Sequence, residues 1–206
     1  MVAIIDYGVG NLFSLCSSFA AIGEAAEVTS DPERIRKADR VILPGVGAFG
    51  DAAEKLRQTG LDSVVREEAG RGKPLMGICL GMQLLFERSY EYGVHEGLGL
   101  LRGEIRPIAE RIPEGLKIPQ MGWNALKFVQ PSQLFKYSRE GEYVYFVHSY
   151  SAVKCEESLL ATTEYGADLT ACVGKGNVFG CQFHPEKSGE VGLRMLKAFC
   201  ETEVRA

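Results

Sequence analysis

The strongest constraint on the fold is an alternation of short apolar segments with helical segments over the first 90 residues. The strand-like segments cover residues 2–5, 27–29, 41–43 and 75–78. The helical segments begin at Asn11 and Pro32 and span residues 51–58, 62–68 and 80–86. Strands that are mostly uncharged are typical of a parallel sheet with both faces covered. We therefore expect an α/β fold whose first half is a parallel sheet flanked by helices.

The first two helices carry explicit start signals. Asn11 is a good N-cap residue, and Gly23 stands where a C-terminal glycine ends a helix. Asp31 followed by Pro32 is typical of a cap and a first-turn proline. Asn11 and Asp31 are thus expected to cap the first and second helices.

The second half of the chain is rich in strands. Strands are expected at residues 105–108, 125–129, 143–150, 159–163, 169–173 and 178–183, and a last helix at residues 190–200. Residues 174–177 (Gly-Lys-Gly-Asn) predict a hairpin loop. Because no linker-like tract divides the chain, we expect residues 1–206 to form one domain. Its central, mostly parallel sheet would be joined to a strand-rich antiparallel second half.

Composition excludes several classes of function. Hydrophobic residues make up 46% and charged residues 24% of the chain, which excludes wholesale disorder. The net charge is -4 and basic runs are short, which disfavours nonspecific nucleic-acid binding. The sequence shows neither a signal-like start nor an apolar run of about 18 residues. We expect a soluble, cytoplasmic protein without a membrane segment.

The six cysteines do not indicate a disulfide framework or a metal site. No C-x-x-C pair occurs, and the histidines lack the spacing of metal ligands. We expect five of the cysteines to be buried small hydrophobes and no metal to be bound. The sixth, Cys79, stands in a different context.

Cys79 lies at the centre of residues 77–81 (Gly-Ile-Cys-Leu-Gly), which have the form of a nucleophile elbow. A strand enters the motif and a helix leaves it. A cysteine at the start of a helix faces backbone N–H groups, and the amide of Leu80 points at the same place. This pattern favours a catalytic nucleophile; the alternative is a buried structural cysteine in a glycine-rich turn.

His184 and Glu186 follow the strand expected at residues 178–183. Pro185 favours an extended conformation of His184, and residues two apart in extended chain point to the same side. The pair then provides a base and the carboxylate that orients it. Alone it is equally a surface pair, but with Cys79 it completes a nucleophile, base and orienting group.

Glycines at Gly45 and Gly47 follow another strand of the same sheet. They allow unusual backbone conformations and expose N–H groups, as an oxyanion hole requires. Residues 45–50 also match the G-x-G-x-x-G pattern of dinucleotide-binding proteins. The pattern does not follow the first strand of the chain, so nucleotide binding is disfavoured.

Three motifs in this order, P-G-V-G, G-I-C-L-G-M-Q and F-H-P-E-K, resemble the class I (triad) glutamine amidotransferases. The resemblance covers nearly the whole chain. Within that family, residues 6–12, 119–124 and 145–150 are similar to the glutaminase subunits of imidazole glycerol phosphate synthase, which serves histidine biosynthesis. The same chemistry also serves other ammonia-using synthases, such as anthranilate or pyridoxal phosphate synthase, which stay open as alternatives. A non-catalytic binding module and a γ-glutamyl peptidase are further alternatives.

The resemblance implies a cofactor-free glutaminase. Cys79 would form a thioester with glutamine, His184 would move the proton, and Glu186 would orient His184. The oxyanion donors would be Leu80 and one amide among Gly45, Val46 and Gly47. The glutamine-binding residues would be Gln83, Glu91, Ser149 and Tyr150.

The resemblance also implies a heterodimer with a (β/α)₈-barrel cyclase, to which ammonia passes. The residues facing it would be Asn11, Met121, Trp123, Tyr145 and Lys187. Trp123 is equally typical of a core aromatic. We expect His148 to be a packed strand histidine and His95 to be exposed. We also expect the isolated chain to be a poor glutaminase, because Gly45 and Gly47 let an oxyanion amide point the wrong way.

Overall fold

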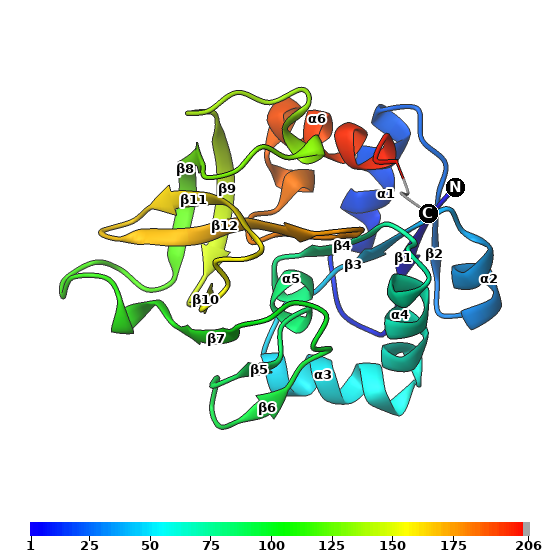
Figure 1. Cartoon of the computed structure of the whole chain (residues 1–206), viewed down its shortest axis with the longest axis horizontal. Coiled ribbons are helices and arrows are strands. Elements are labelled where there is room, and N and C mark those ends of the chain that lie inside the picture. The colour runs from blue at the N-terminus through cyan, green and yellow to red at the C-terminus, as the bar shows by residue number, and fades with distance from the viewer. Residues whose placement is uncertain (204–206) are drawn as a thin grey trace.

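The computed structural model describes residues 1–203, and within them nine strands form one large sheet in the order β2-β1-β3-β4-β13-β12-β11-β8-β9 (Figure 1). Its first half pairs in parallel throughout. The strands of this half are β1 (Val2–Ile5), β2 (Ala26–Thr29), β3 (Arg40–Leu43), β4 (Leu75–Ile78) and β13 (Val178–Cys181). The helices between them are α1 (Leu12–Ala21), α2 (Pro32–Lys37), α3 (Phe49–Gln58), α4 (Leu61–Gly70) and α5 (Leu80–Leu84). The expected parallel, helix-covered half is confirmed.

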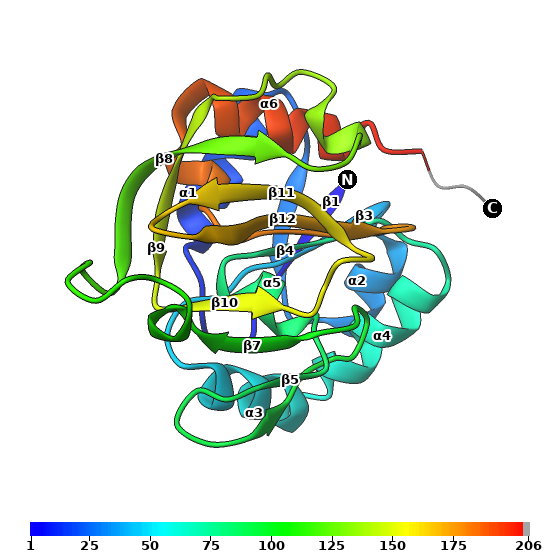
Figure 2. The same cartoon turned by 60° about the vertical axis from the view of Figure 1, so that its left-hand side comes forward.

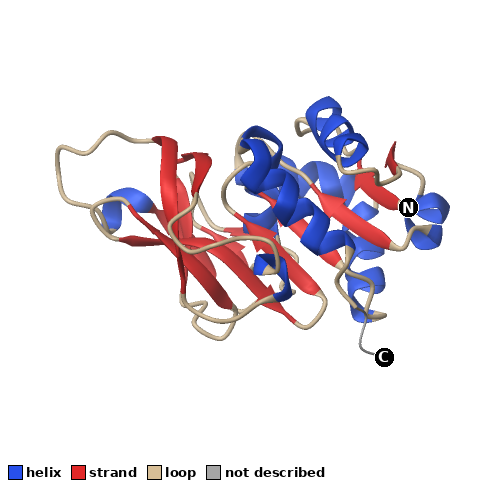
Figure 3. Ribbon diagram, turned by 90° about the horizontal axis from the view of Figure 1, so that it is seen from above, coloured by secondary structure: helices blue, strands red, loops and turns tan. Residues whose placement is uncertain are grey.

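The second half of the large sheet pairs only in antiparallel fashion among the described residues. It contains β12 (Asp168–Lys175), β11 (Leu159–Glu164), β8 (Gln120–Phe128) and β9 (Tyr143–His148). Strand β13 joins the halves, because it runs parallel to β4 and antiparallel to β12. Figure 3 shows the helix-rich and strand-rich halves side by side.

Four further described strands form a small sheet in the order β10-β7-β5-β6, below β11 and β12 in Figure 2. They are β5 (Arg88–Ser89), β6 (His95–Glu96), β7 (Glu104–Pro107) and β10 (Tyr150–Val153). The expectation of one strand over residues 143–150 is wrong. The chain leaves the large sheet after His148 and enters the small sheet at Tyr150, where β10 pairs with β7.

The remaining elements differ from the expectations mainly in length. Helix α5 ends at Leu84 rather than at residue 86, and β8 begins already at Gln120. Three 3-10 turns were not anticipated, and helix α6 starts at residue 189. Their bounds are η1 (Ile108–Glu110), η2 (Gln133–Phe135), η3 (Pro185–Lys187) and α6 (Gly189–Cys200).

The core has one layer on each side of the parallel strands. Ile5 and Leu43 pack toward α3, α4 and α5, whereas Ile4 and Ile42 pack toward α1 and α6. In Figure 1 the two groups of helices lie below and above the strands. Burial of both faces explains why these strands carry so little charge. Among residues 1–203, no helix combines the length and apolar character needed to cross a membrane.

All six cysteines lie within the described residues and are free. Four of the five expected to be buried are so, but Cys16 on α1 is half-buried. Of the two helix start signals, one is confirmed and one is not. Asp31 accepts a hydrogen bond from the N–H of Glu33 at 2.8 Å, whereas the Asn11 side chain makes no capping hydrogen bond, so that expectation is wrong.

Candidate active site

Cys79 is the sharpest backbone feature of the candidate site. It joins β4 to α5 with φ of +55° and ψ of -113°, a left-handed conformation that disfavours any side chain. A Cβ added to Gly77 would lie 2.5 Å from the carbonyl oxygen of Gly81. A Cβ added to Gly81 would lie 1.8 Å from the carbonyl oxygen of Leu43. The expected elbow is therefore present, and its glycines are sterically required.

Helix α5 contains five residues, fewer than expected. A short helix aligns few peptide dipoles behind Cys79, so its long-range field is weak. The N–H of Leu80, at the first helical position, is the group of this helix that can donate a hydrogen bond to a negative charge near the sulfur. Cys79 itself is 7% exposed and lines a cavity.

His184 and Glu186 form a buried pair beside Cys79. Nδ1 of His184 lies 2.8 Å from Oε1 of Glu186, and both side chains are almost fully buried. The surface-pair alternative is therefore wrong. The backbone N–H of His184 also donates to the carbonyl oxygen of Tyr145 at 3.0 Å, which fixes the start of this segment.

The local reason for the pairing differs in part from the expected one. His184 is extended, with φ of -98° and ψ of 99°, but Pro185 begins the 3-10 turn η3. Glu186 therefore reaches His184 across a tight turn rather than along a strand. The proximity that the sequence predicted is confirmed, although its geometry is not that of extended chain.

The charge state of His184 follows from its neighbours. Burial by itself lowers the pKa of the imidazole, but hydrogen bonding to Cys79 and to Glu186 outweighs burial and raises the pKa to about 9. The ring thus holds a proton at neutral pH while it contacts the sulfur. Such a contact is the arrangement expected of a nucleophile and its base.

A cavity of about 500 Å³ opens above the sulfur. Nine of the candidate residues line it: Val46, Gly47, Cys79, Leu80, Gln83, Glu91, Ser149, Tyr150 and His184. Sequence reasoning did not anticipate five further lining residues: Tyr92, Ile118, Pro119, Val147 and His148. Those residues come from loops and strand ends that only the tertiary fold brings together.

Gly45 does not line the cavity, contrary to its expected place in the oxyanion hole. A Cβ there would lie 2.8 Å from the backbone nitrogen of Gly81, so the glycine lets its loop pack tightly on the elbow. Tyr7 anchors the same loop by donating its hydroxyl to the carbonyl oxygen of Pro44 at 2.7 Å. Gly47 has φ of +95° and faces the cavity beside Val46.

Glu91 is buried rather than a simple loop charge. Its Oε2 accepts a hydrogen bond from the N–H of Phe49 at 2.6 Å, at the first residue of α3. Burial raises the pKa of this carboxyl, and the Phe49 hydrogen bond opposes the rise. Glu91 therefore places a carboxylate at the cavity wall while it caps a helix.

Gln83 is buried and belongs to a chain of amide hydrogen bonds. Its Nε2 donates to the carbonyl oxygen of Tyr150 at 3.2 Å and to Oε1 of Gln182 at 3.0 Å. Gln182 in turn donates from Nε2 to Sγ of Cys79 at 3.8 Å. Sequence reasoning missed Gln182, whose only available signal was its position two residues before His184.

The other two histidines were not expected to carry chemistry. His148 is a packed strand histidine, as predicted, with Nδ1 2.8 Å from the carbonyl oxygen of Tyr150 and Nε2 2.9 Å from Oε1 of Gln120. Burial lowers its pKa to about 4, so the ring is neutral. His95 was expected to be exposed but is half-buried, because its ring packs against Gly50.

An exposed apolar face borders the cavity on strands β8 and β9. Met121 pairs with Val147, and Trp123 with Tyr145, so these four side chains share one face. Met121 is 62% and Trp123 52% exposed, which rules out the core alternative for Trp123.

Of the remaining expected partner-facing residues, Lys187 lies at this face, and Asn11 lies on another element. Lys187 places Nζ 6.0 Å from the centroid of the Tyr145 ring, which also packs edge-to-face against Trp123 at 6.1 Å. Asn11 is half-buried at the start of α1. The preceding Gly10 lies close to Pro44, in the loop that leads to Val46 and Gly47.

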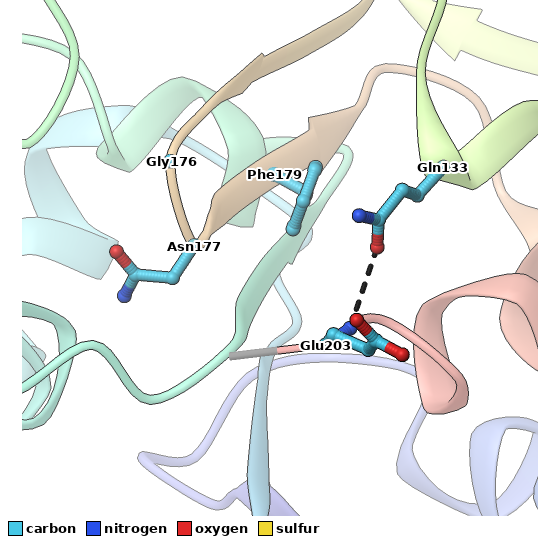
Figure 4. A pocket seen from close by; sticks show the side chains of 5 residues that line it. All are labelled: Gln133, Gly176, Asn177, Phe179 and Glu203. Atoms are coloured by element: carbon cyan, nitrogen blue, oxygen red, sulfur yellow. Dashed lines mark hydrogen bonds between the residues drawn. The ribbon is translucent and has the colours of Figure 1, made fainter. Parts of the chain in front are cut away.

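A second cavity lies apart from this chemistry. It has a volume of about 300 Å³ and is lined by Gln133, Gly176, Asn177, Phe179 and Glu203 (Figure 4). It lies at the two-residue turn between β12 and β13 and contains none of the candidate site residues. The candidate active site is therefore the cavity at Cys79.

Comparison with known proteins places this fold and site in one class. The family model for glutamine amidotransferase class-I matches residues 3–202. The chain belongs to this family of enzymes. A crystal structure of a glutamine amidotransferase superimposes with a TM-score of 0.76 at 21% identity and covers 98% of both chains. PurLQS from Thermotoga maritima does so with a TM-score of 0.74 at 23% identity, over 97% of this chain and 96% of that one. At these identities the two structures establish the fold.

More similar relatives belong to one branch of the family. The imidazole glycerol phosphate synthase subunit HisH of Wolinella succinogenes is 53% identical over 203 residues, which are 98% of this chain and 99% of the relative. The protein of the same name from Oceanobacillus iheyensis is 53% identical over 202 residues, 98% of each chain. The similarity extends over nearly the whole length of both relatives.

Proposed function

We propose that this chain is the glutaminase subunit of an imidazole glycerol phosphate synthase. It hydrolyses L-glutamine to glutamate and passes ammonia to a (β/α)₈-barrel cyclase subunit, which forms imidazole glycerol phosphate and aminoimidazole carboxamide ribotide. The observation that carries the proposal is the meeting of Cys79 and His184 at one cavity, with Glu186 bonded to His184. Full-length similarity to HisH subunits supports the choice of synthase.

The reaction begins with attack of the Cys79 sulfur on the side-chain amide carbon of glutamine. His184 holds the proton that leaves the thiol and transfers it to the amide nitrogen. The carbon–nitrogen bond breaks, ammonia leaves, and a γ-glutamyl thioester remains on Cys79. Glu186 holds the Nδ1–H of His184, so that Nε2 faces the reacting atoms, and stabilises the imidazolium.

Water then attacks the thioester, with His184 as the base. The sulfur–carbon bond breaks, its electron pair returns to sulfur, and glutamate leaves. Negative charge develops on the carbonyl oxygen in both halves of the reaction. Val46, Gly47 and Leu80 line the cavity, and the N–H of Leu80 together with one from Val46 or Gly47 stabilises this charge in the active complex.

The rest of the cavity wall holds the amino-acid end of glutamine. The Glu91 carboxylate attracts the α-ammonium group, while Gln83 and the backbone at Ser149 and Tyr150 bind polar groups of the substrate. No cofactor is needed, because each step moves only protons and one acyl group. The six free cysteines fit a reducing cytoplasm.

Ammonia needs a dry route to the second active site, since bulk water protonates it. The exposed face of Met121, Trp123 and Tyr145 borders the cavity and has the aromatic character of an interface centre. Lys187, whose Nζ lies over the Tyr145 ring, adds a polar contact at its edge, and Asn11 adds another contact to the cyclase from the start of α1. A cyclase seated on this face covers the cavity and receives ammonia without exposure to solvent.

The test is glutamate release by the wild type and by Cys79→Ser, each with and without the cyclase and its nucleotide ligand. We expect Cys79→Ser to lower the rate by about 10³-fold or more, as for other nucleophile replacements. The wild-type chain alone should be slow, and the complex faster by orders of magnitude. An unchanged rate in Cys79→Ser removes Cys79 from the reaction, and full activity of the lone chain contradicts the dependence on the partner.

A further inference from the structure

A buried glutamine that the mechanism above does not use contacts the reacting sulfur. Gln182 follows β13 directly and is 0% exposed. Its Nε2 lies 3.8 Å from Sγ of Cys79, and its Oε1 accepts from Nε2 of Gln83 at 3.0 Å. Both the NH₂ group and the oxygen of the Gln182 side chain thus make hydrogen bonds within the protein, and Gln182 stands two residues before His184.

The orientation of this amide is fixed by its neighbours. Nε2 of Gln83 also donates to the backbone carbonyl of Tyr150 at 3.2 Å. An amide nitrogen can donate but cannot accept, so Gln182 must present its oxygen to Gln83. Its NH₂ group is consequently directed at the sulfur. The chain of hydrogen bonds therefore starts at a backbone carbonyl and ends at Cys79.

The acceptor at the end of this chain changes strength during the reaction. A neutral thiol or a thioester sulfur accepts a hydrogen bond weakly, whereas a thiolate accepts it strongly. A buried N–H that faces this sulfur therefore favours the negatively charged form over the neutral form.

We infer that Gln182 is a further residue of this reaction, as the hydrogen-bond donor to the Cys79 thiolate. The inference rests on the proposed role of Cys79 as the nucleophile. Gln182 stabilises the thiolate before attack, when its proton lies on His184. It does so again when the thioester is hydrolysed and the electron pair of the sulfur–carbon bond returns to sulfur. Because Gln182 also holds Gln83, it links the sulfur to the wall that binds glutamine.

The experiment measures the rate of Cys79 alkylation by iodoacetamide from pH 5 to pH 10, with the modified peptide quantified by mass spectrometry. This readout needs neither glutamine nor the cyclase. The proteins are the wild type, Gln182→Leu, which removes the donor, and Gln182→Glu, which keeps an oxygen toward Gln83. Gln120→Leu is the matched control, because Gln120 is also a fully buried glutamine but is bonded to His148.

The alkylation rate rises with pH as the Cys79 thiolate forms, and the midpoint is the pH at which this rise is half complete. We expect this midpoint to increase by about one pH unit in Gln182→Leu, as for the loss of a hydrogen bond to a charged group. In Gln182→Glu it should rise at least as far, because a carboxylate beside the sulfur opposes negative charge. The midpoint of Gln120→Leu should equal that of the wild type. If Gln182→Leu fails to fold, Gln182→Met, which is close to glutamine in length and also lacks the N–H donor, is measured in its place.

An unchanged or lowered midpoint in the Gln182 variants overturns the inference, and so does an equal rise in Gln120→Leu. Failure of the proposed function gives a different result. In that case wild-type Cys79 reacts no faster than the half-buried Cys16, and both ideas fall. If wild-type Cys79 is alkylated selectively but the midpoints of the Gln182 variants equal that of the wild type, only the role of Gln182 is removed.

Discussion

The parallel and antiparallel halves of the large sheet build the site in different ways. The parallel half supplies backbone: the strained turn at Cys79 and the loop at Gly47, each at the carboxyl end of a strand. The antiparallel half supplies side chains, because β8 and β9 carry the exposed face at Trp123, and the joining strand β13 leads to the side chain of His184. Strand β13 aligns the two sets, because it pairs with both halves.

This difference has a consequence for tolerance to substitution. At Gly81 in the parallel half the nearest atoms are backbone atoms, which cannot move aside, whereas at Gly174 in the antiparallel half the nearest atoms belong to side chains, which can change rotamer. The parallel half should therefore respond abruptly to added volume. In the antiparallel half, the loss of stability or binding should depend on which side-chain groups are changed.

The largest expected effect is the contrast between Gly81→Ala and Gly174→Ala. A Cβ at Gly81 meets a backbone carbonyl at 1.8 Å, so we expect a loss of at least about 3 kcal/mol in the free energy of unfolding. A Cβ at Gly174 meets side-chain atoms of Leu160 and Phe179 at 2.7 and 2.9 Å, for a loss of about 1 kcal/mol. Urea unfolding measures both. Equal losses contradict the distinction between the halves.

The next contrast lies between two buried histidines: His184, which follows the joining strand β13, and His148, at the end of β9 in the antiparallel half. The pKa of His184 is raised to about 9, so its contribution to stability is complete below the unfolded value of about 6.5 and is lost as pH rises toward 9. The pKa of His148 is lowered to about 4, so its contribution is present above about 6.5 and is lost as pH falls toward 4.

Each histidine should change the free energy of unfolding by on the order of 2 kcal/mol across its own pH window. Urea unfolding at several pH values, for the wild type, His184→Gln and His148→Gln, separates the two windows. The advantage of the wild type over His184→Gln should shrink above pH 6.5, and its advantage over His148→Gln should shrink below that pH. Parallel pH curves for all three proteins contradict both assignments.

A smaller effect is expected where the antiparallel half meets the proposed partner. Trp123→Ala should weaken binding of the cyclase by about 10-fold to 100-fold, as for an aromatic residue at an interface centre. Its free energy of unfolding should change little, because the side chain is half exposed. Calorimetric titration with the cyclase measures the affinity. Val129→Ala, at a residue 50% exposed just beyond β8, is the control; an equal loss in both variants removes the special role of Trp123.

The comparison also explains what the sequence could predict. The bounds of β1 and β4 agree with the expected segments, because a strand buried on both faces is visible as a local apolar run. Cys79 was identified because its flanking glycines are a local requirement of the turn. In the antiparallel half, the break at Ser149 was missed, since it arises from the pairing of β10 with the distant β7. Gln182 was missed for the same reason: its partners Cys79 and Gln83 lie about 100 residues away.

The smallest expected effect tests how far a local signal can be trusted even in the parallel half. Asp31 and Asn11 are equally good N-cap residues by type, but only Asp31 makes a capping hydrogen bond. We expect Asp31→Ala to lower the free energy of unfolding by about 1 kcal/mol and Asn11→Ala to leave it nearly unchanged. Urea unfolding of the isolated chain measures this without the partner. The reason is tertiary: the chain enters α1 from the loop at Gly10, which packs on Pro44, so contacts with another loop, rather than a cap, set where α1 begins. A loss in Asn11→Ala as large as that in Asp31→Ala would show that α1 depends on its own start signal after all.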